Sequence, residues 1–374
     1  GQKAPDHSTI ARFRKGFLSE ACEDLFYQMV CRLKDAGELS TDTVFIDGTK
    51  LEACANKYTF VWKKSVGKWE EKMFLRIQEA VRLLNLEYFQ SFTVKAESRT
   101  QDLQKIHDYL TEKCRQDGTV FVHGRGKRKC RNQKYLELFR RFLERQVTYE
   151  WHTASFQGRN NYCKTDPDAT FMHMKDDHMR NAQLKPGYNV QIGVDSEYIV
   201  AADIFQDRND VWTLIPFLKT MEEKLGFRYP SVTADSGYES EEGYTYLKEA
   251  GQKPYIKPQT YEKWKKRSFK QDISKRENMA YDESKDTYTC HAGKRLNVLY
   301  LKKQKSKSGY ESEVTVYECE NCTDCSYKEK CTRAKGNKRL YVSKSFLEKR
   351  QESYENILSE TGILYRMNRS IQVE

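Results

Sequence analysis

The sequence contains no apolar run of about 18 or more residues, the length that a membrane-spanning helix needs. Its opening residues, GQKAPDHSTI, lack the apolar stretch of a secretory signal. Eleven cysteines in a chain without an export signal indicate reduced thiols or metal ligands rather than a disulfide framework. We therefore expect a cytoplasmic protein with no membrane partner.

Acidic residues are fewer than basic ones, with 54 Asp and Glu against 65 Lys and Arg and a net charge of +11. This surplus favours a polyanionic partner, although basic proteins without such a partner are common. Hydrophobic residues make up 38% of the 374 residues and aromatic residues 13%, which excludes a wholly disordered chain. A chain of this length can hold two or three structural units.

Two short apolar runs end on a carboxylate. Asp47 follows residues 44–46 in TVFIDGTK, and Asp235 follows residues 231–234 in YPSVTADSGY. In open α/β sheets, functional groups collect outside the strand ends, so both acids are candidates for chemistry. The alternative is that Asp235 and Gly237 only form a turn, which the sequence Asp-Ser-Gly does well.

The order of predicted elements indicates the fold. The strand with Asp47 is followed by a hairpin (GYNVQIGVDS and EYIVAADIF), a helix from about 210 to 225, the strand with Asp235, a helix from about 240 to 250, and a short strand near Tyr255. This is the order of a ribonuclease-H-like domain. We therefore predict an α/β fold with a ribonuclease-H-like mixed sheet, interrupted by a charged helical insert and a Cys-rich insert.

The expected organisation has six parts. They are an N-terminal helical segment that ends a DNA-binding domain (1–40), the first part of the catalytic core (41–62), the charged helical insert (63–150), the core continued (151–257), a Lys/Tyr-rich insert with the Cys cluster (258–343), and a closing catalytic helix (344–374).

A basic loop lies within the charged insert, in HGRGKRKCRNQKYLELFRRFLERQ. A loop of this charge followed by a basic amphipathic helix suits a phosphate backbone. The alternative is a solvated helical insert without a ligand. The candidate DNA-binding residues here are Arg125, Lys127, Arg128, Lys129 and Arg131.

The second insert contains CENCTDCSYKEKC, with Cys319, Cys322, Cys325 and Cys331. Four thiolates in so short a segment suit a structural Zn²⁺ site, and Cys290 could replace one of them. The alternatives are no metal, or an iron–sulfur cluster, for which the final C-x3-C-P of bacterial ferredoxins is absent. A second Asp- and His-rich stretch, TDPDATFMHMKDDH, is interpreted as a loop that lines a groove rather than a metal site.

Several stretches in order along the chain resemble bacterial DDE insertion-sequence transposases with a ribonuclease-H-like catalytic domain. These are PDHSTIARFRK, FIDGTKLEA, KTDPDATFM, GYNVQIGVDS, TADSGYESEE and RSIQVE. The resemblance implies a catalytic triad of Asp47, Asp235 and Glu374 that holds Mg²⁺ or Mn²⁺. It also implies double-stranded DNA (transposon ends and target) as partner, a homodimer on DNA, and a nucleoid-associated location.

The last helix departs from the family pattern. Counting back from Glu374, the Tyr and Arg places of the family signature hold Met367 and Ser370, and the family's C-terminal segment would lie beyond residue 374. We therefore expect a truncated chain, and the alternative function is a catalytically silent transposase relic that only binds DNA. Further predicted DNA contacts are Lys50, Tyr238, Arg366 and Arg369, with a helix cap as the alternative for Tyr238.

Overall fold

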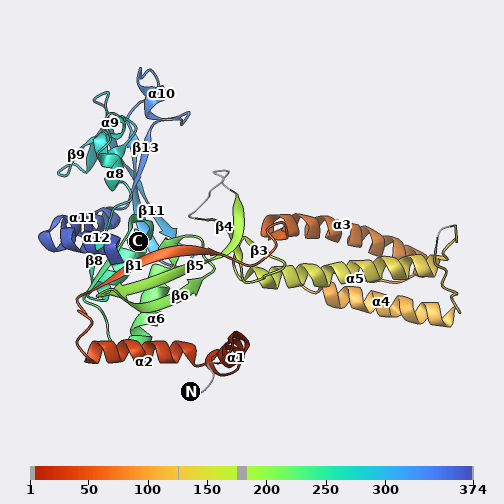
Figure 1. Cartoon of the computed structure of the whole chain (residues 1–374). Helices are drawn as coiled ribbons and strands as arrows, with labels where there is room; N and C mark the ends of the chain where they lie inside the picture. Colours follow the sequence, from red (N-terminus) through yellow and green to blue (C-terminus); the bar gives the residue numbers. More distant parts are fainter. Residues whose placement is uncertain (1–4, 125, 175–182, 373–374) are drawn as a thin grey trace. The chain divides into compact units, whose positions relative to one another are not determined.

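The computed structural model describes residues 5–124, 126–174 and 183–372 (Figure 1). The chain forms two compact units. The core unit comprises Gly1–Thr49, Asn189–Phe205 and Asn209–Glu374, and the helical unit comprises Lys50–Tyr188 and Gln206–Arg208. Within the described ranges, none of the helices is long and apolar enough to cross a membrane.

A mixed sheet forms the centre of the core unit. Its strand order is β4-β5-β1-β7-β8, and β6 also pairs with β5. β1 pairs in parallel with β7 and β7 in parallel with β8, whereas β4 (Thr170–His173) and β6 both pair antiparallel with β5. β1 and β5 each continue into the helical unit. The bounds are β1 (Thr43–Glu52), β5 (Leu184–Asp195), β6 (Tyr198–Phe205), β7 (Ser231–Ala234) and β8 (Lys253–Ile256).

Helices pack on both faces of this sheet. Successive side chains of β1 point to opposite faces, so this strand contacts helices on each side. Val44 and Ile46 belong to a buried cluster with residues of α2 (Cys22–Asp35), α6 (Leu214–Leu225) and α7 (Glu241–Glu249). Phe45, between them, makes an edge contact with Tyr365 on α12 (Glu360–Gln372), with ring centroids 6.0 Å apart. The predicted α/β class is confirmed.

The region before the closing helices is a separate antiparallel sheet of order β13-β12-β11-β10-β9. Its strands are β9 (Ala280–Asp282), β10 (Thr287–Thr289), β11 (Arg295–Lys305), β12 (Glu311–Cys319) and β13 (Arg339–Val342). The remaining short helices of the core unit are α1 (His7–Phe13), η1 (Arg14–Leu18), η2 (Asp210–Trp212), η3 (Ser236–Tyr238), α8 (Tyr261–Trp264), α9 (Arg267–Lys270), η4 (Arg276–Asn278) and α10 (Lys328–Cys331).

The closing segment is two helices, α11 (Lys344–Leu358) and α12, where we predicted one. Ser359 interrupts them because its backbone is extended, with ψ of 160°. Its hydroxyl accepts a hydrogen bond from the backbone N–H of Gly362 at 3.1 Å, and so caps the new helix. A serine within a charged helical pattern gave no sequence signal strong enough to predict this break.

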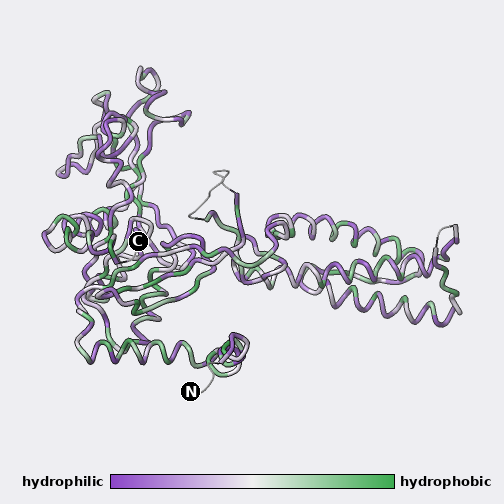
Figure 2. Tube along the Cα trace, viewed as in Figure 1, coloured by the Kyte–Doolittle hydropathy of each residue, from purple (hydrophilic) through white to green (hydrophobic). Residues whose placement is uncertain are grey.

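Three long helices dominate the helical unit: α3 (Lys63–Tyr88), α4 (Arg99–Gln116) and α5 (Arg131–Phe156). Figure 2 shows hydrophilic and hydrophobic residues alternating along each of them. The apolar residues recur at helical spacing, for example Met73, Ile77 and Leu84 on α3, and form a core with α4 and α5. Short strands complete the unit: β2 (Phe60–Trp62), β3 (Asn161–Cys163) and β4 (Thr170–His173).

Candidate active site

Asp47 and Asp235 lie next to each other at one edge of the core sheet. In the parallel pair of β1 and β7, Ile46 is the partner of Ala234, and each acid is the next residue of its strand. The carboxyl ends of parallel strands meet at the same edge, which is where α/β proteins place their chemistry. The structure therefore brings two of the three predicted catalytic acids together.

The two carboxylates differ in what they bind. Asp47 Oδ1 accepts a hydrogen bond from the backbone N–H of Gly48 at 2.9 Å, and Arg369 Nη1 on α12 lies 3.9 Å from the same oxygen. Asp235 Oδ1 accepts from the backbone N–H of Gly237 at 2.7 Å and begins the 3-10 helix η3. Asp235 thus makes the turn that its sequence predicts and also stands at the strand end.

A third acid, Asp210, lies at the same place, and we did not predict it. Its Oδ1 accepts hydrogen bonds from Asn189 Nδ2 at 2.8 Å and Gln191 Nε2 at 3.3 Å. A methyl group added to Gly48 would lie 3.2 Å from Asp210 Oδ1, and one added to Gly237 would lie 3.2 Å from Asp210 Oδ2. Asp210 therefore sits against the glycines that follow the two predicted acids.

Asp210 gave no clear sequence signal because an acid at the start of a helix is usually explained by the helix itself. In the sequence it marks the start of the predicted helix at about 210, and the structure does place it first in η2. Only the side-chain hydrogen bonds from Asn189 and Gln191 on β5 show that this acid also belongs to the candidate active site. That pairing joins residues about twenty positions apart.

Tyr238 lies beneath this edge and not on the surface. It is 1% exposed, and its hydroxyl donates a hydrogen bond to Gln191 Oε1. Burial raises its pKa above the ordinary value, and the negative charges of Asp210, Asp47 and Asp235 raise it further. The predicted DNA contact is therefore wrong for this side chain, and Ser240 rather than Tyr238 caps α7.

Two predicted DNA contacts on helix α12, Arg369 and Arg366, lie against other side chains of the protein. Arg369 is 15% exposed and faces Asp47, while Arg366 Nη1 donates to the hydroxyl of Tyr261 at 3.3 Å. Near the end of α12, Gln372 Oε1 accepts from the backbone N–H of Glu197 at 3.4 Å, in the turn after β5. Glu374, the third predicted catalytic acid, lies outside the described residues.

One family model matches the chain over residues 289–374, and it describes a transposase DDE domain. Over these residues the chain is similar to that family. The match supports the resemblance that the sequence motifs indicated. It begins at the last residue of β10 and covers the strands from β11 onward and both closing helices, including position 374. No curated protein and no solved structure matches the chain.

The acids of the candidate site fit a hard divalent cation in their chemistry, since Mg²⁺ prefers carboxylate oxygens. Asp47 and Asp235 supply two carboxylates at one sheet edge, with Asp210 beside them. Within residues 5–124, 126–174 and 183–372, no three His, Cys, Asp or Glu side chains are arranged to hold a metal ion.

Five of the cysteines gather in one pocket. It is lined by Cys290 together with all four predicted zinc ligands, Cys319, Cys322, Cys325 and Cys331. Burial raises the pKa of Cys319 to about 12, and the neighbouring thiols of Cys322 and Cys290 raise it as well. The thiols share a site as predicted, but the described part of the chain contains no metal-holding arrangement, so zinc remains a prediction.

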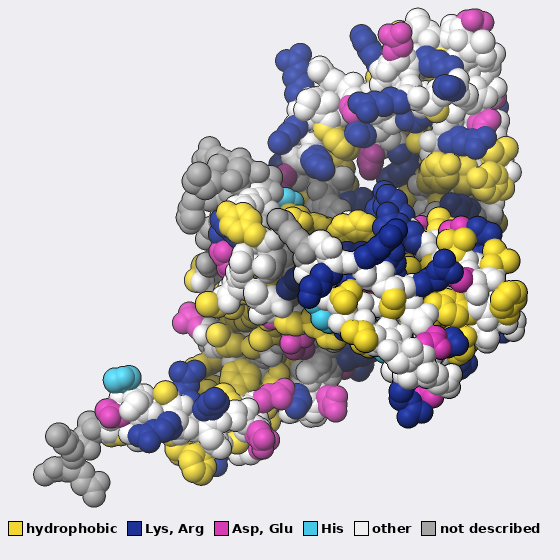
Figure 3. All heavy atoms as spheres, turned by 90° about the vertical axis from the view of Figure 1, so that its right-hand side faces the viewer, with side chains coloured by type: hydrophobic (Ala, Val, Ile, Leu, Met, Phe, Trp, Pro, Cys, Tyr) yellow, Lys and Arg dark blue, Asp and Glu magenta, His cyan; other side chains and the backbone are white. Residues whose placement is uncertain are grey.

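The predicted basic loop splits into paired and unpaired cations. Lys129 Nζ lies 2.5 Å from Glu137 Oε2, and Arg131 forms an ion pair with Glu87. Lys127 and Arg128 are exposed, and Arg125 lies outside the described residues. Figure 3 shows Lys and Arg side chains interspersed with hydrophobic and acidic ones over the face that it presents. Lys50, the remaining predicted contact, is half-buried and belongs to the helical unit.

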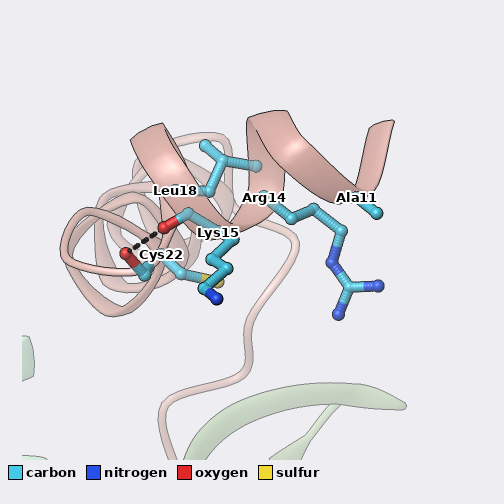
Figure 4. A pocket seen from close by; sticks show the side chains of 6 residues that line it. Ala11, Arg14, Lys15, Leu18 and Cys22 are labelled. Carbon is cyan, nitrogen blue, oxygen red and sulfur yellow. Dashed lines mark hydrogen bonds between the residues drawn. The ribbon is translucent and has the colours of Figure 1, made fainter. Parts of the chain in front are cut away.

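The N-terminal helices carry an open hollow of about 440 Å³ (Figure 4). It is lined by Ala11, Arg14, Lys15, Leu18, Ser19 and Cys22. The Ser19 hydroxyl donates to the carbonyl of Lys15 at 2.9 Å across the π-helical turn η1. The hollow shares no residue with the strand-end acids, so it is not part of the candidate active site.

Proposed function

We propose that this protein cleaves the ends of its own insertion sequence and joins the freed 3′ ends to target DNA. The observation that carries the proposal is the parallel register of β1 and β7, which sets Asp47 beside Asp235. The transposase DDE domain match over residues 289–374 supports the same reaction class. By resemblance, the protein acts as a homodimer on double-stranded DNA.

Asp47 and Asp235 would hold divalent metal ions, Mg²⁺ or Mn²⁺, together with Glu374. When bound, such ions activate an attacking water or 3′ hydroxyl and stabilise the leaving oxygen of the phosphodiester. The backbone N–H groups of Gly48 and Gly237 each fix one oxygen of their neighbouring carboxylate. Because a carboxylate is rigid and planar, the same hydrogen bond also restricts the direction of its second oxygen.

Asp210 acts in this proposal as a positioning residue. It holds Asn189 and Gln191, and Gln191 Oε1 in turn accepts the hydroxyl proton of Tyr238. Tyr238 lies close to Asp47 and Asp235. The hydrogen bonds that link Asp210, Gln191 and Tyr238 therefore fix the side chains that pack beneath these two acids. Arg369 offsets the negative charge of Asp47.

The test is cleavage of a DNA duplex that carries the element's own ends, with Mg²⁺ present. Asp47→Asn and Asp235→Asn each keep the side-chain volume but remove a metal-binding charge. We expect each to lower the cleavage rate at least about 100-fold. Binding of the same DNA should change by no more than about twofold, because phosphate contacts come from Lys and Arg.

Cleavage at the wild-type rate by either variant would remove the proposed metal site. If the wild-type protein binds the ends but never cleaves them, the alternative of a silent, DNA-binding transposase relic is favoured. Glu374→Gln, tested in the same assay, decides whether the third ligand is Glu374. Asp210→Asn should reduce the rate without abolishing dependence on Mg²⁺.

A further inference from the structure

A groove of about 380 Å³ opens on the helical unit between α3 and α5. Seven residues from both helices line it, and we call them the aromatic groove: Trp69, Lys72, Met73, Arg76, Phe142, Arg145 and Tyr149. Of the groove residues, only Arg145 belongs to the basic stretch that we predicted to suit a phosphate backbone, and none is among the individually predicted DNA contacts. It contains three cations and three aromatic rings.

Helical spacing explains how these side chains meet. Trp69, Lys72 and Arg76 are three and four residues apart on α3, and Phe142, Arg145 and Tyr149 are three and four residues apart on α5. Residues at such intervals lie on one face of a helix. Because the two helices pack against each other, the two faces form the walls of one groove.

The cations of the groove have no acidic ion-pair partner in the part of the chain that the structure describes. Among the described residues, Lys72, Arg76 and Arg145 form no ion pair. The nearby acids are engaged elsewhere, since Glu70 lies 2.6 Å from Arg99 and Glu144 lies 3.7 Å from Arg140. An unneutralised group of three positive charges attracts an anion with several charges.

The aromatic rings restrict which anion fits. Trp69 is 56% exposed although it stands among charged residues, whereas Tyr149 at 9% is set into the wall. Aromatic faces beside cations that follow a backbone are the pattern of single-strand nucleic acid sites, because the rings stack on bases. A duplex does not offer its base faces, since they are stacked inside it.

We propose that the aromatic groove binds an unpaired segment of DNA, with phosphates on Lys72, Arg76 and Arg145 and a base stacked on Trp69. The proposal rests on the proposed DNA function and names a contact within it. It assigns the helical unit a role in holding DNA where strands are separated. The contact requires no metal ion.

The test measures binding of the full chain to a fluorescein-labelled single strand of about 12 thymidines by fluorescence anisotropy. Trp69→Ala should weaken this binding roughly 5- to 100-fold, and Trp69→Phe should restore most of it. Phe89→Ala is the matched control, because Phe89 is 93% exposed in the same unit and does not line the groove. It should bind as the wild type does.

Salt dependence tests the cations separately. Each phosphate contact on a single strand contributes about 0.7 to the slope of log affinity against log salt. Arg76→Gln and Arg145→Gln should each lower that slope by about this amount. The control is Arg141→Gln, since Arg141 donates to the carbonyl of Glu137 and lies outside the groove.

Unchanged single-strand binding in Trp69→Ala and Arg145→Gln would overturn the aromatic groove as a DNA site, even if the protein cleaves its own ends. If these substitutions weakened binding of the single strand and of a blunt duplex equally, the proposal would also be overturned. That result would indicate that the groove attracts DNA by charge alone and does not stack unpaired bases. If the wild type binds neither DNA, the proposed function fails as well.

Discussion

At the residue scale, Gly48 shows how closely the acids are packed. A methyl group there would lie 2.5 Å from Gln191 Nε2 and 3.1 Å from the Tyr238 hydroxyl, as well as against Asp210. Neither neighbour is free to move, because the Tyr238 hydroxyl is bonded to Gln191. The glycine after Asp47 is therefore required by close approach of side chains and not by an unusual backbone angle.

We predict that Gly48→Ala destabilises the core unit by about 1–3 kcal/mol and lowers DNA cleavage, since it displaces the side chains under the acids. Urea unfolding and the cleavage assay measure the two effects. The control is Gly67→Ala in helix α3, where a methyl group would meet nothing within 4 Å. That variant should be stabilised by about 0.5–1 kcal/mol. Equal effects of the two substitutions would contradict the packing argument.

Sequence reasoning found the acids that end strands, because an apolar run followed by Asp is a local pattern. It missed Asp210 and misplaced Tyr238, because both depend on Gln191, which lies on another strand. The proximity of Arg369 to Asp47 gave no sequence signal, since the two residues lie far apart in the chain, and its predicted DNA contact stays a prediction. Tertiary neighbours, and not residue types, assign these roles.

At the scale of elements, Asp286 joins parts of the Cys-containing sheet to the closing helices. Its carboxylate accepts hydrogen bonds from the hydroxyl of Tyr281 on β9 at 2.7 Å and from that of Tyr317 on β12 at 2.6 Å. It also accepts one from Lys344 Nζ on α11 at 2.7 Å. Its φ of 51° is left-handed, which Asp and Asn tolerate better than most residues. One turn residue thus connects two strands and a helix.

The charge of Asp286 makes this link sensitive to pH. Burial alone would raise its pKa, but the hydrogen bonds from Lys344, Tyr317 and Tyr281 outweigh burial and hold the pKa below its ordinary value. A carboxyl whose pKa is lower in the folded state stabilises the fold above its unfolded pKa and stops doing so as the pH falls. The contribution is therefore lost below about pH 4.

We predict that Asp286→Asn lowers the free energy of unfolding by about 1–2 kcal/mol at pH 7, because charge-assisted hydrogen bonds become neutral ones. Asn keeps the turn, so the substitution isolates the charge. The difference between wild type and variant, measured by urea unfolding, should shrink toward zero below about pH 4. A difference that stays constant from pH 7 to acid conditions would show that the charge is not what matters.

At the scale of the whole molecule, much of the element order was predictable. The hairpin of β5 and β6, helix α6 and the strands ending on Asp47 and Asp235 follow apolar patterns of period two or 3.6. The extent of the helical unit was not predictable from the same patterns. The helical unit begins at Lys50, which lies within β1. A strand pattern in the sequence does not reveal where one compact unit ends and the next begins, so this boundary was not predictable.

Two separate hydrophobic cores follow from this division, and they lead to a prediction about stability. Phe139 is fully buried in a cluster made only of helical-unit residues, while Val232 and Ile256 belong to a cluster made only of core-unit residues. Phe139→Ala should cost about 3–5 kcal/mol in the helical unit by leaving a cavity. Hydrogen exchange should show lost protection in α3, α4 and α5, and unchanged protection in β7 and β8. Equal loss of protection in both sets of elements would mean that the chain unfolds as one cooperative body and that each unit depends on the other for its stability.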